Sequence, residues 1–245
     1  MVSALILASM AAAASCWQVY DAALRHSAQA LHPPYIQYDE RISVVADDRP
    51  LVVSRAHVDY RDDGVARVTD ARFDNYPFIT RQTEPGPPVL GPYGSERLTW
   101  LPPENHGYKL ISDVRNHGDA DCTMAGTETY KGHTTYHLRF SHVGNDRPEL
   151  HGLWVDTSSD DIWKIVLSGY IYFTGSQSAP PLANFEVELG YSGPYLMVNH
   201  VVWKYRNYEY SQWDDYFGEY YFSDFHFPDK LPAETFAQTA GRGTK

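Results

Sequence analysis

The sequence predicts a mainly β protein, built on an antiparallel sheet with one apolar face and little helix. Residues 134–191 alternate between apolar and polar side chains, which is typical of strands with one buried face. Nineteen Tyr, ten Phe and six Trp in 245 residues form an aromatic composition that favours strands. Short runs of Gly, Asn, Asp and Pro separate the alternating segments, as turns between strands require.

The first residues predict export. Residues 2–14 form an apolar, Ala-rich run that is too short to span a bilayer and is followed by small residues, as in a secretory signal peptide. The run lacks Lys or Arg near its start, and a buried N-terminal helix is the alternative. We therefore expect a signal peptide over residues 1–15, one β domain over 16–236 and a flexible tail over 237–245.

The two cysteines, Cys16 and Cys122, leave several outcomes open. Residues 13–16 (AASC) weakly resemble a bacterial lipobox, in which Cys16 would carry a lipid and attach the protein peripherally to the outer membrane. Cleavage near Ala14 by the ordinary signal peptidase is the alternative. A disulfide between the two cysteines is permitted in an oxidising compartment, and an unpaired Cys122 is equally compatible.

The segments before residue 108 are expected to form a helix, a first meander and a lid. Residues 18–31 predict an amphipathic helix that ends before two prolines and packs on the open apolar face. Residues 74–107 contain seven prolines but keep apolar side chains, which predicts a packed flap rather than regular sheet. Strands are expected over residues 35–45, 51–60 and 65–73.

Residues 108–122 are expected to form a strand followed by a polar turn. Residues 108–114 alternate like a strand, whereas residues 117–122 contain one His, two Asp and one Cys. Zinc sites need more closely spaced Cys and His than this, so we interpret the segment as a solvated turn. Strands are also expected over residues 195–205 and 218–227.

Four strands predicted between residues 134 and 191 form the centre of the sheet. Turns near residues 144–148 and 157–160 would place Asp156 opposite Asp161. In that register Trp163 lies beside Trp154, Ile165 beside Gly152 and Leu167 beside Leu150. The expected apolar lining consists of Tyr136, Leu138, Phe140, Trp154, Trp163, Ile165, Leu167, Phe185 and Val187.

Charge and motifs argue against several functions. The formal net charge is −11, and nucleic acid or an anionic membrane surface would require clustered Lys and Arg. No nucleophile elbow, zinc-protease helix, phosphate loop or dinucleotide motif is present, so we expect neither an enzyme nor a cofactor. His133, His137 and His151 could share a face as a metal patch, but surface histidines are the preferred interpretation, and no metal site is expected.

Loose strand and turn patterns resemble the LolA/LolB-like superfamily of bacterial envelope proteins. They comprise residues 126–138 (GTETYKGHTTYHL), residues 153–156 (LWVD) and residues 225–227 (FHF) before Leu231 and Pro232. The resemblance implies a curved antiparallel sheet or incomplete β-barrel whose mouth is covered by helices and loops. It also implies a hydrophobic cavity for the acyl chains of lipids or lipoproteins, a role in lipoprotein transport, and a periplasmic or outer-membrane-anchored location.

Three functions from different classes follow. The first is a non-enzymatic carrier or sensor that holds acyl chains against the nine lining residues. The second is an envelope interaction module whose core is filled and which binds another protein through its edge or acidic surface. The third, with the least support, is a hydrolase of envelope glycans or lipids, which would need an acid pair and a histidine in one cleft.

Overall fold

The computed structural model describes residues 14–46, 49–62, 66–74, 89–90, 111, 120–142, 149–170, 182–209 and 212–236. The predicted signal peptide (except 14–15), nearly all of the predicted flap, the turn at 144–148 and the predicted tail lie outside these residues.

One helix opens the described chain and a long succession of strands follows it. The elements are α1 (Cys16–Gln29), β1 (Tyr35–Ala46), β2 (Arg49–Arg61), β3 (Ala66–Asp74), β4 (Val89–Leu90), β5 (Ala120–Tyr130), β6 (His133–His142), β7 (Glu149–Asp156), β8 (Ile162–Tyr170), β9 (Leu182–Ser192), β10 (Tyr195–Glu209), β11 (Gln212–His226) and the 3-10 helix η2 (Ala233–Thr235).

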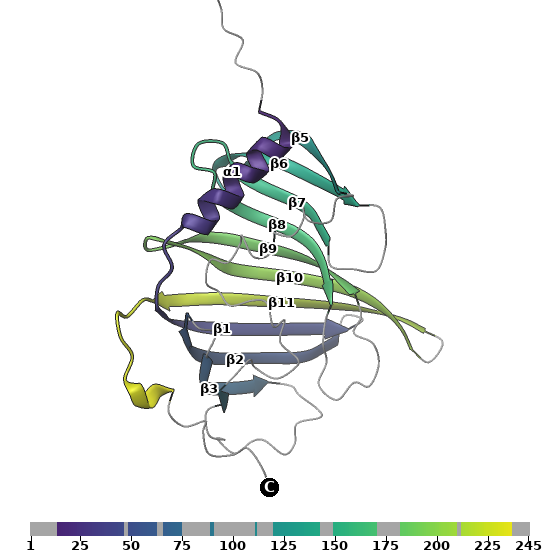
Figure 1. Ribbon diagram of the computed structural model, residues 1–245. Helices are drawn as coiled ribbons and strands as arrows, with labels where there is room; N and C mark the ends of the chain where they lie inside the picture. Colours follow the sequence, from purple (N-terminus) through teal and green to yellow (C-terminus); the bar gives the residue numbers. More distant parts are fainter. Residues whose placement is uncertain are drawn as a thin grey trace, which may run out of the picture.

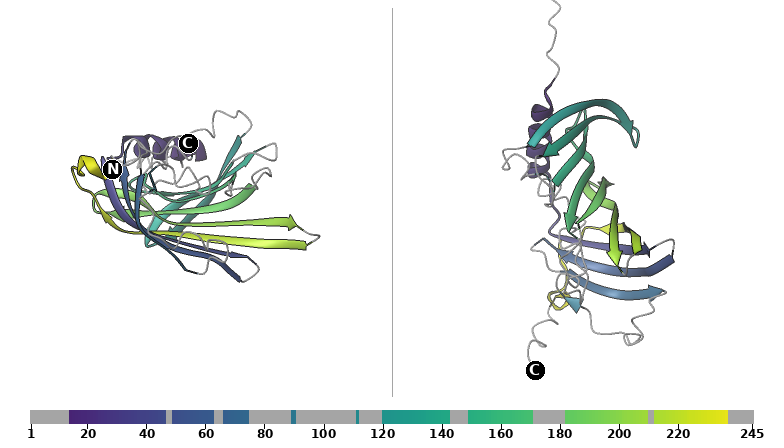
Figure 2. Two further views of the ribbon diagram at one scale, coloured as in Figure 1. Left: turned by 90° about the horizontal axis from the view of Figure 1, so that it is seen from below. Right: turned by 90° about the vertical axis from the view of Figure 1, so that its right-hand side faces the viewer.

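The strands form one antiparallel sheet in the order β4-β3-β2-β1-β11-β10-β9-β8-β7-β6-β5. The first and last long strands, β1 and β11, are hydrogen-bonded neighbours in the middle of the sheet. Among the described strands β4 and β5 form the two ends and do not pair with each other, so the sheet is open. Figure 2 shows that it is strongly curved, and the mainly β fold with an N-terminal helix is confirmed.

Helix α1 crosses the strands at the β5 end of the sheet (Figure 1). Ser15 and Gln18 start it with a capping box: the Ser15 side chain accepts from the Gln18 N–H, and the Gln18 side chain accepts from the Ser15 N–H. This arrangement satisfies two N–H groups that a helix start would leave without partners. Val19, Tyr20 and Ala23 are buried, so the predicted amphipathic helix and its place on the apolar face are confirmed.

The face that α1 covers is called the inner face below, and the opposite one the outer face. The edge-to-face contact of Tyr20 with Phe140, at 5.7 Å between ring centroids, assigns Phe140 to the inner face. Leu138 and Tyr136 share that face because side chains two residues apart in a strand point the same way. Cys122 lies opposite Phe140 in β5 and is on the inner face too.

Two local predictions before β6 are wrong. Residues 120–122, expected in a polar turn, are the first residues of β5, because Cys122 pairs with Phe140 and its side chain turns inward. Ile111 is the one described residue of the strand expected over 108–114, and its backbone is helical. Ile111 is fully buried, and its carbonyl accepts a hydrogen bond of 2.5 Å from the Tyr20 hydroxyl.

The register expected for β7 is correct at its ends and wrong in its middle. The Asp156 N–H donates to the Asp161 carbonyl at 2.8 Å, and Leu150 pairs with Leu167. However, Leu138 pairs with Leu153, and Trp154 pairs with His137 and Lys164. Register shifts in the β7–β8 pair leave His151 as an extra residue, and such a bulge exchanges the faces of the residues that follow it.

Candidate ligand-binding face

The inner face carries a continuous apolar row across the strands. Each member lies directly opposite the next on the neighbouring strand: Leu138, Leu153, Ile165, Val187, Val201 and Tyr220, on β6 to β11 in spatial order. A second row runs beside it through Leu150, Leu167, Phe185 and Trp203. All ten side chains are buried, several of them completely. Their burial supplies the main hydrophobic stabilisation of the sheet.

Helix α1 is the cover of this face among the described elements, and it is held at both ends. At its start, a disulfide joins Cys16 to Cys122 on β5. Near its end, His26 Nε2 lies 2.9 Å from the Asp161 carboxylate, which also accepts hydrogen bonds from Tyr191 and Ser159. The main contacts of α1 are with β5, β6 and β7, whereas the apolar rows continue to β11.

Most of the nine expected lining residues lie together on the inner face. Seven of them lie in the two apolar rows or at alternate positions of the same strands: Tyr136, Leu138, Phe140, Ile165, Leu167, Phe185 and Val187. Trp154 does not, because the bulge at His151 turns it to the outer face. Trp163 is not beside Trp154. It is itself a bulged residue, and its ring stacks on His133 at 3.9 Å and meets Tyr191 edge-on at 6.0 Å.

The inner face also contains residues that the lining prediction missed. They are Leu153 and Val155 on β7, Val201 and Trp203 on β10, and Tyr220 on β11. The alternating pattern of residues 195–205 indicated that Val201 and Trp203 share one face of a strand. The face of these two residues became assignable only through the pairing of β9 with β10.

The structure contains the disulfide, which is one of the outcomes left open for Cys16. A lipid anchor would need the Cys16 sulfur as a thioether, whereas here that sulfur is bonded to Cys122. The structure thus corresponds to the disulfide alternative, and lipidation at Cys16 stays a prediction. Both cysteines are engaged in stabilising the packing of α1 on β5.

The aspartates around the β7–β8 hairpin make a structural turn, as expected from their position. Asp156 Oδ1 accepts from the Ser158 N–H and hydroxyl at 2.8 and 2.6 Å and from the Ser159 N–H at 3.2 Å. Burial opposes ionisation of Asp156, but these bonds and His133 outweigh it and lower its pKa to about 2. The carboxylate thus holds the turn.

The outer face carries a polar and aromatic network across β5 to β11. Trp154 stacks on His137 at 4.0 Å and donates to Glu128. Glu188 accepts from the Tyr130 hydroxyl at 2.6 Å and lies 3.0 Å from Lys131 Nζ and 3.3 Å from His200 Nδ1. His133 and His137 are engaged with Asp156 and Trp154, respectively. Among the described residues, no three His, Cys, Asp or Glu side chains converge as metal ligands would.

Acid is expected to destabilise the protein partly through Glu188. Burial opposes its ionisation, but hydrogen bonds from Tyr130 and Lys131, with the Lys131 charge, outweigh it and lower the pKa to about 2 from 4.5. Between these pH values the unfolded chain binds more protons than the folded protein. The stabilisation that Glu188 contributes is therefore complete above about pH 4.5 and is lost as the pH falls toward 2. We expect Glu188→Gln to cost on the order of 2 kcal/mol at pH 7, measured by urea unfolding.

The cost of Glu188→Gln should shrink by more than half at pH 3. The control is Glu186→Gln, two residues earlier on the same face, whose carboxylate is half exposed and pairs with Lys164 at 2.5 Å. A smaller effect with weaker pH dependence is expected there. Equal costs of Glu188→Gln at pH 7 and pH 3 would contradict the account.

In the part of the chain that the structure describes, these features define a class of open, curved antiparallel sheet whose apolar inner face is covered in part by an N-terminal helix. No helix in the described parts of the chain is long and apolar enough to cross a membrane. No protein-family model and no curated protein matches the sequence.

Three solved structures are similar to the chain over most of its length. A LolA superfamily protein from Nitrosomonas europaea matches 92% of this chain and 99% of its own, at 14% identity and a TM-score of 0.40. A DUF1329 family protein from Desulfovibrio piger matches 92% and 98%, at 12% identity and a TM-score of 0.43. A domain titled as an outer membrane lipoprotein-sorting protein, from Vibrio parahaemolyticus, matches 89% and 95%, at 11% identity and a TM-score of 0.43.

Proposed function

We propose that the protein is a non-enzymatic envelope protein that binds the acyl chains of lipids or lipoproteins on the inner face of the sheet, beside α1. The observation that carries the proposal is the extent of the apolar rows, which continue to β11 beyond the strands that α1 mainly contacts. An apolar face that is wider than the strands contacted by α1 suits an apolar ligand. Binding would be driven by desolvation, at roughly 25 cal/mol per Å² of apolar area buried.

The disulfide supports an exported location for this function. Structural disulfides persist in oxidising compartments such as the bacterial periplasm and are rare in the cytosol. The Cys16–Cys122 bond therefore agrees with the export expected from residues 2–14. We place the protein in the periplasm, where a carrier or sensor of acyl chains would meet its ligand.

A second candidate is an interaction module that binds an envelope protein. It is favoured by the complete burial of inner-face side chains such as Leu153, Phe185 and Val187 by the protein itself. A core that is already filled leaves no room for an acyl chain. The acyl-chain experiment below separates the two candidates.

Acyl-chain binding is tested on protein exported and purified without detergent. We expect co-purifying lipid in native mass spectra, and a higher melting temperature with a fatty acid or a lipopeptide, because a ligand that binds only the folded state stabilises it. If the protein is consistently empty and neither compound raises the melting temperature, the interaction module is preferred.

Two neighbouring substitutions locate the binding to one face. Val201 lies on the inner face and Val202 on the outer face of β10, opposite Tyr220 and Glu219 respectively. Val201→Phe should reduce lipid occupancy by filling the inner face, whereas Val202→Phe should leave it unchanged. Circular dichroism checks that both variants fold. Equal occupancy in the two variants would place the ligand elsewhere.

A further inference from the structure

A pair of arginines, Arg41 and Arg55, lies on the outer face at the other end of the sheet from α1. Arg41 on β1 pairs with Arg55 on β2, and Arg55 pairs with Arg72 on β3. Like charges directly opposite each other destabilise a sheet. The chain has 31 acidic residues against 20 Lys and Arg, so two arginines directly opposite each other are unusual for its composition. Such an arrangement is favourable when an anion lies between the side chains.

The guanidinium groups of Arg41 and Arg55 are available for a ligand. Both side chains are exposed, and no ion pair or hydrogen bond joins either group to another residue in the part of the chain that the structure describes. Arg206 on the same sheet differs from these two arginines, because its guanidinium donates hydrogen bonds of 2.7 and 3.2 Å to the Asp215 carboxylate.

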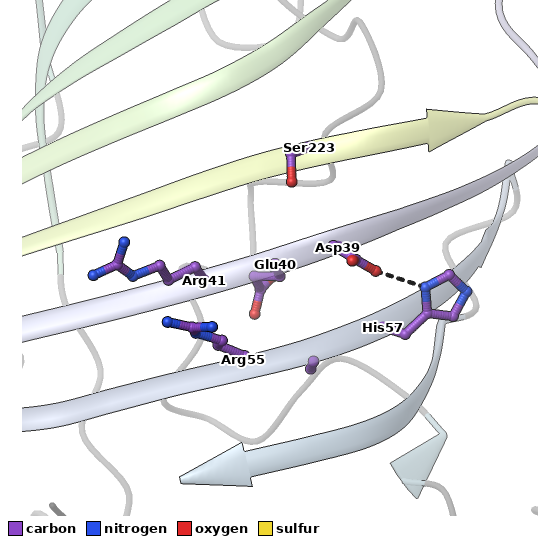
Figure 3. Close-up of a pocket in the computed structure, with 7 residues that line it drawn as sticks. Asp39, Glu40, Arg41, Arg55, His57 and Ser223 are labelled. Carbon is purple, nitrogen blue, oxygen red and sulfur yellow. Dashed lines mark hydrogen bonds and ion pairs between the residues drawn. The ribbon is translucent and has the colours of Figure 1, made fainter. Parts of the chain in front are cut away.

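A pocket of about 650 Å³ opens where the two arginines meet. Figure 3 shows their side chains extending in the same direction from neighbouring strands, with Asp39 and His57 on the other side and Ser223 of β11 above them. Glu40 and Ala56, both buried, alternate with these residues and form the floor. Register shifts after Gln37 in the β1–β11 pair and after Arg55 in the β2–β3 pair flank the pocket. Bulges of this kind re-aim side chains and are frequent beside functional sites.

The acidic groups of the pocket are already engaged. The Asp39 carboxylate lies 2.8 Å from His57 Nδ1, and Glu40 is only 4% exposed. A ligand in the pocket meets both guanidinium groups, and the Asp39 carboxylate, whose side chain is 55% exposed, lies on the other side. Guanidinium forks match the oxygens of phosphate and carboxylate groups with paired hydrogen bonds.

We propose that this pocket binds a phosphate group, held between Arg41 and Arg55. The site is independent of acyl-chain binding, because it lies on the opposite face of the sheet. A phosphate of this kind could belong to a soluble phosphomonoester or to a lipid headgroup. The net charge of −11 repels an anionic membrane as a whole, which favours the soluble source.

Titration with inorganic phosphate at low salt, followed by calorimetry, tests the site. The double variant Arg41→Gln/Arg55→Gln should bind about tenfold more weakly or worse, because two charge-assisted contacts are lost. Arg206→Gln, which removes an arginine that is already paired, should bind like the natural protein. Without phosphate, the double variant should melt at the same or a higher temperature, since the like-charge repulsion is gone. Absence of phosphate binding in the natural protein, or unchanged binding in the double variant, overturns the proposal.

Cosedimentation with vesicles identifies the source of the phosphate. Vesicles of phosphatidylglycerol and of phosphatidylcholine are compared, with and without competing glycerol phosphate. Arginine-dependent sedimentation that glycerol phosphate displaces supports a lipid headgroup. Arginine-dependent binding of glycerol phosphate without sedimentation supports a soluble ligand, and a lack of both overturns the proposal.

Discussion

Replacing both cysteines by serine is expected to lower the free energy of unfolding by about 4 kcal/mol. Cys16 and Cys122 are 106 residues apart in sequence, and a cross-link that closes so long a loop removes much of the entropy of the unfolded chain. Cys16 is also 6% exposed, so a serine hydroxyl there loses water contacts. The Cys16→Ser/Cys122→Ser variant is compared with the natural protein by urea unfolding in non-reducing buffer.

A reducing agent provides the control for the cysteine variant. It should destabilise the natural protein by a similar amount and leave the double variant unchanged, since only the natural protein has a bond to lose. The remaining attachment of α1, from His26 to Asp161 and from Tyr20 to Ile111, should keep the helix in place in the folded variant. A loss below about 1 kcal/mol would mean that the bond does little to restrict the unfolded chain.

Strand positions could be predicted from the sequence because alternation is local. The patterns over 35–45, 51–60 and 185–191 fall inside β1, β2 and β9. The face of β7 could not be predicted in the same way. Its segment, Glu149–Asp156, has large apolar side chains at both parities, so two registers bury almost equal apolar area. The bulge at His151 decides between them, and a bulge has no fixed residue signature.

The sites depend on contacts between distant parts of the chain. The apolar rows were partly predictable, because hairpins connect β6 to β9 in sequence order. The arginine pocket was not, since Ser223 reaches Asp39 only through the pairing of β1 with β11. The cysteine pairing could not be predicted for the same reason. Two cysteines in the sequence permitted a disulfide, but only the docking of α1 on β5 brings them together. Pairing across such separations is set by the whole sheet rather than by local patterns.

Gly218→Ala is expected to cost about 3 kcal/mol of folding stability. Gly218 on β11 lies directly opposite Trp203 on β10, and the indole covers the space that a side chain would occupy. A Cβ at position 218 would come within 2.1 to 2.4 Å of three Trp203 ring atoms. Trp203 is only 2% exposed, so its ring has no free volume into which to move. Thermal and urea unfolding of the alanine variant measure the loss.

Gly152→Ala is the matched control for Gly218→Ala. Its Cβ would approach the ring end of Trp154 at 3.0 Å, but Trp154 lies on the outer face and is not fully buried, so its ring can shift at a cost below about 1 kcal/mol. In a Trp203→Phe background, Gly218→Ala should cost less than in the natural protein, with a coupling of about 1 kcal/mol or more. If the alanine at 218 costs the same beside Phe as beside Trp, the loss comes from the backbone at 218 and not from contact with the ring.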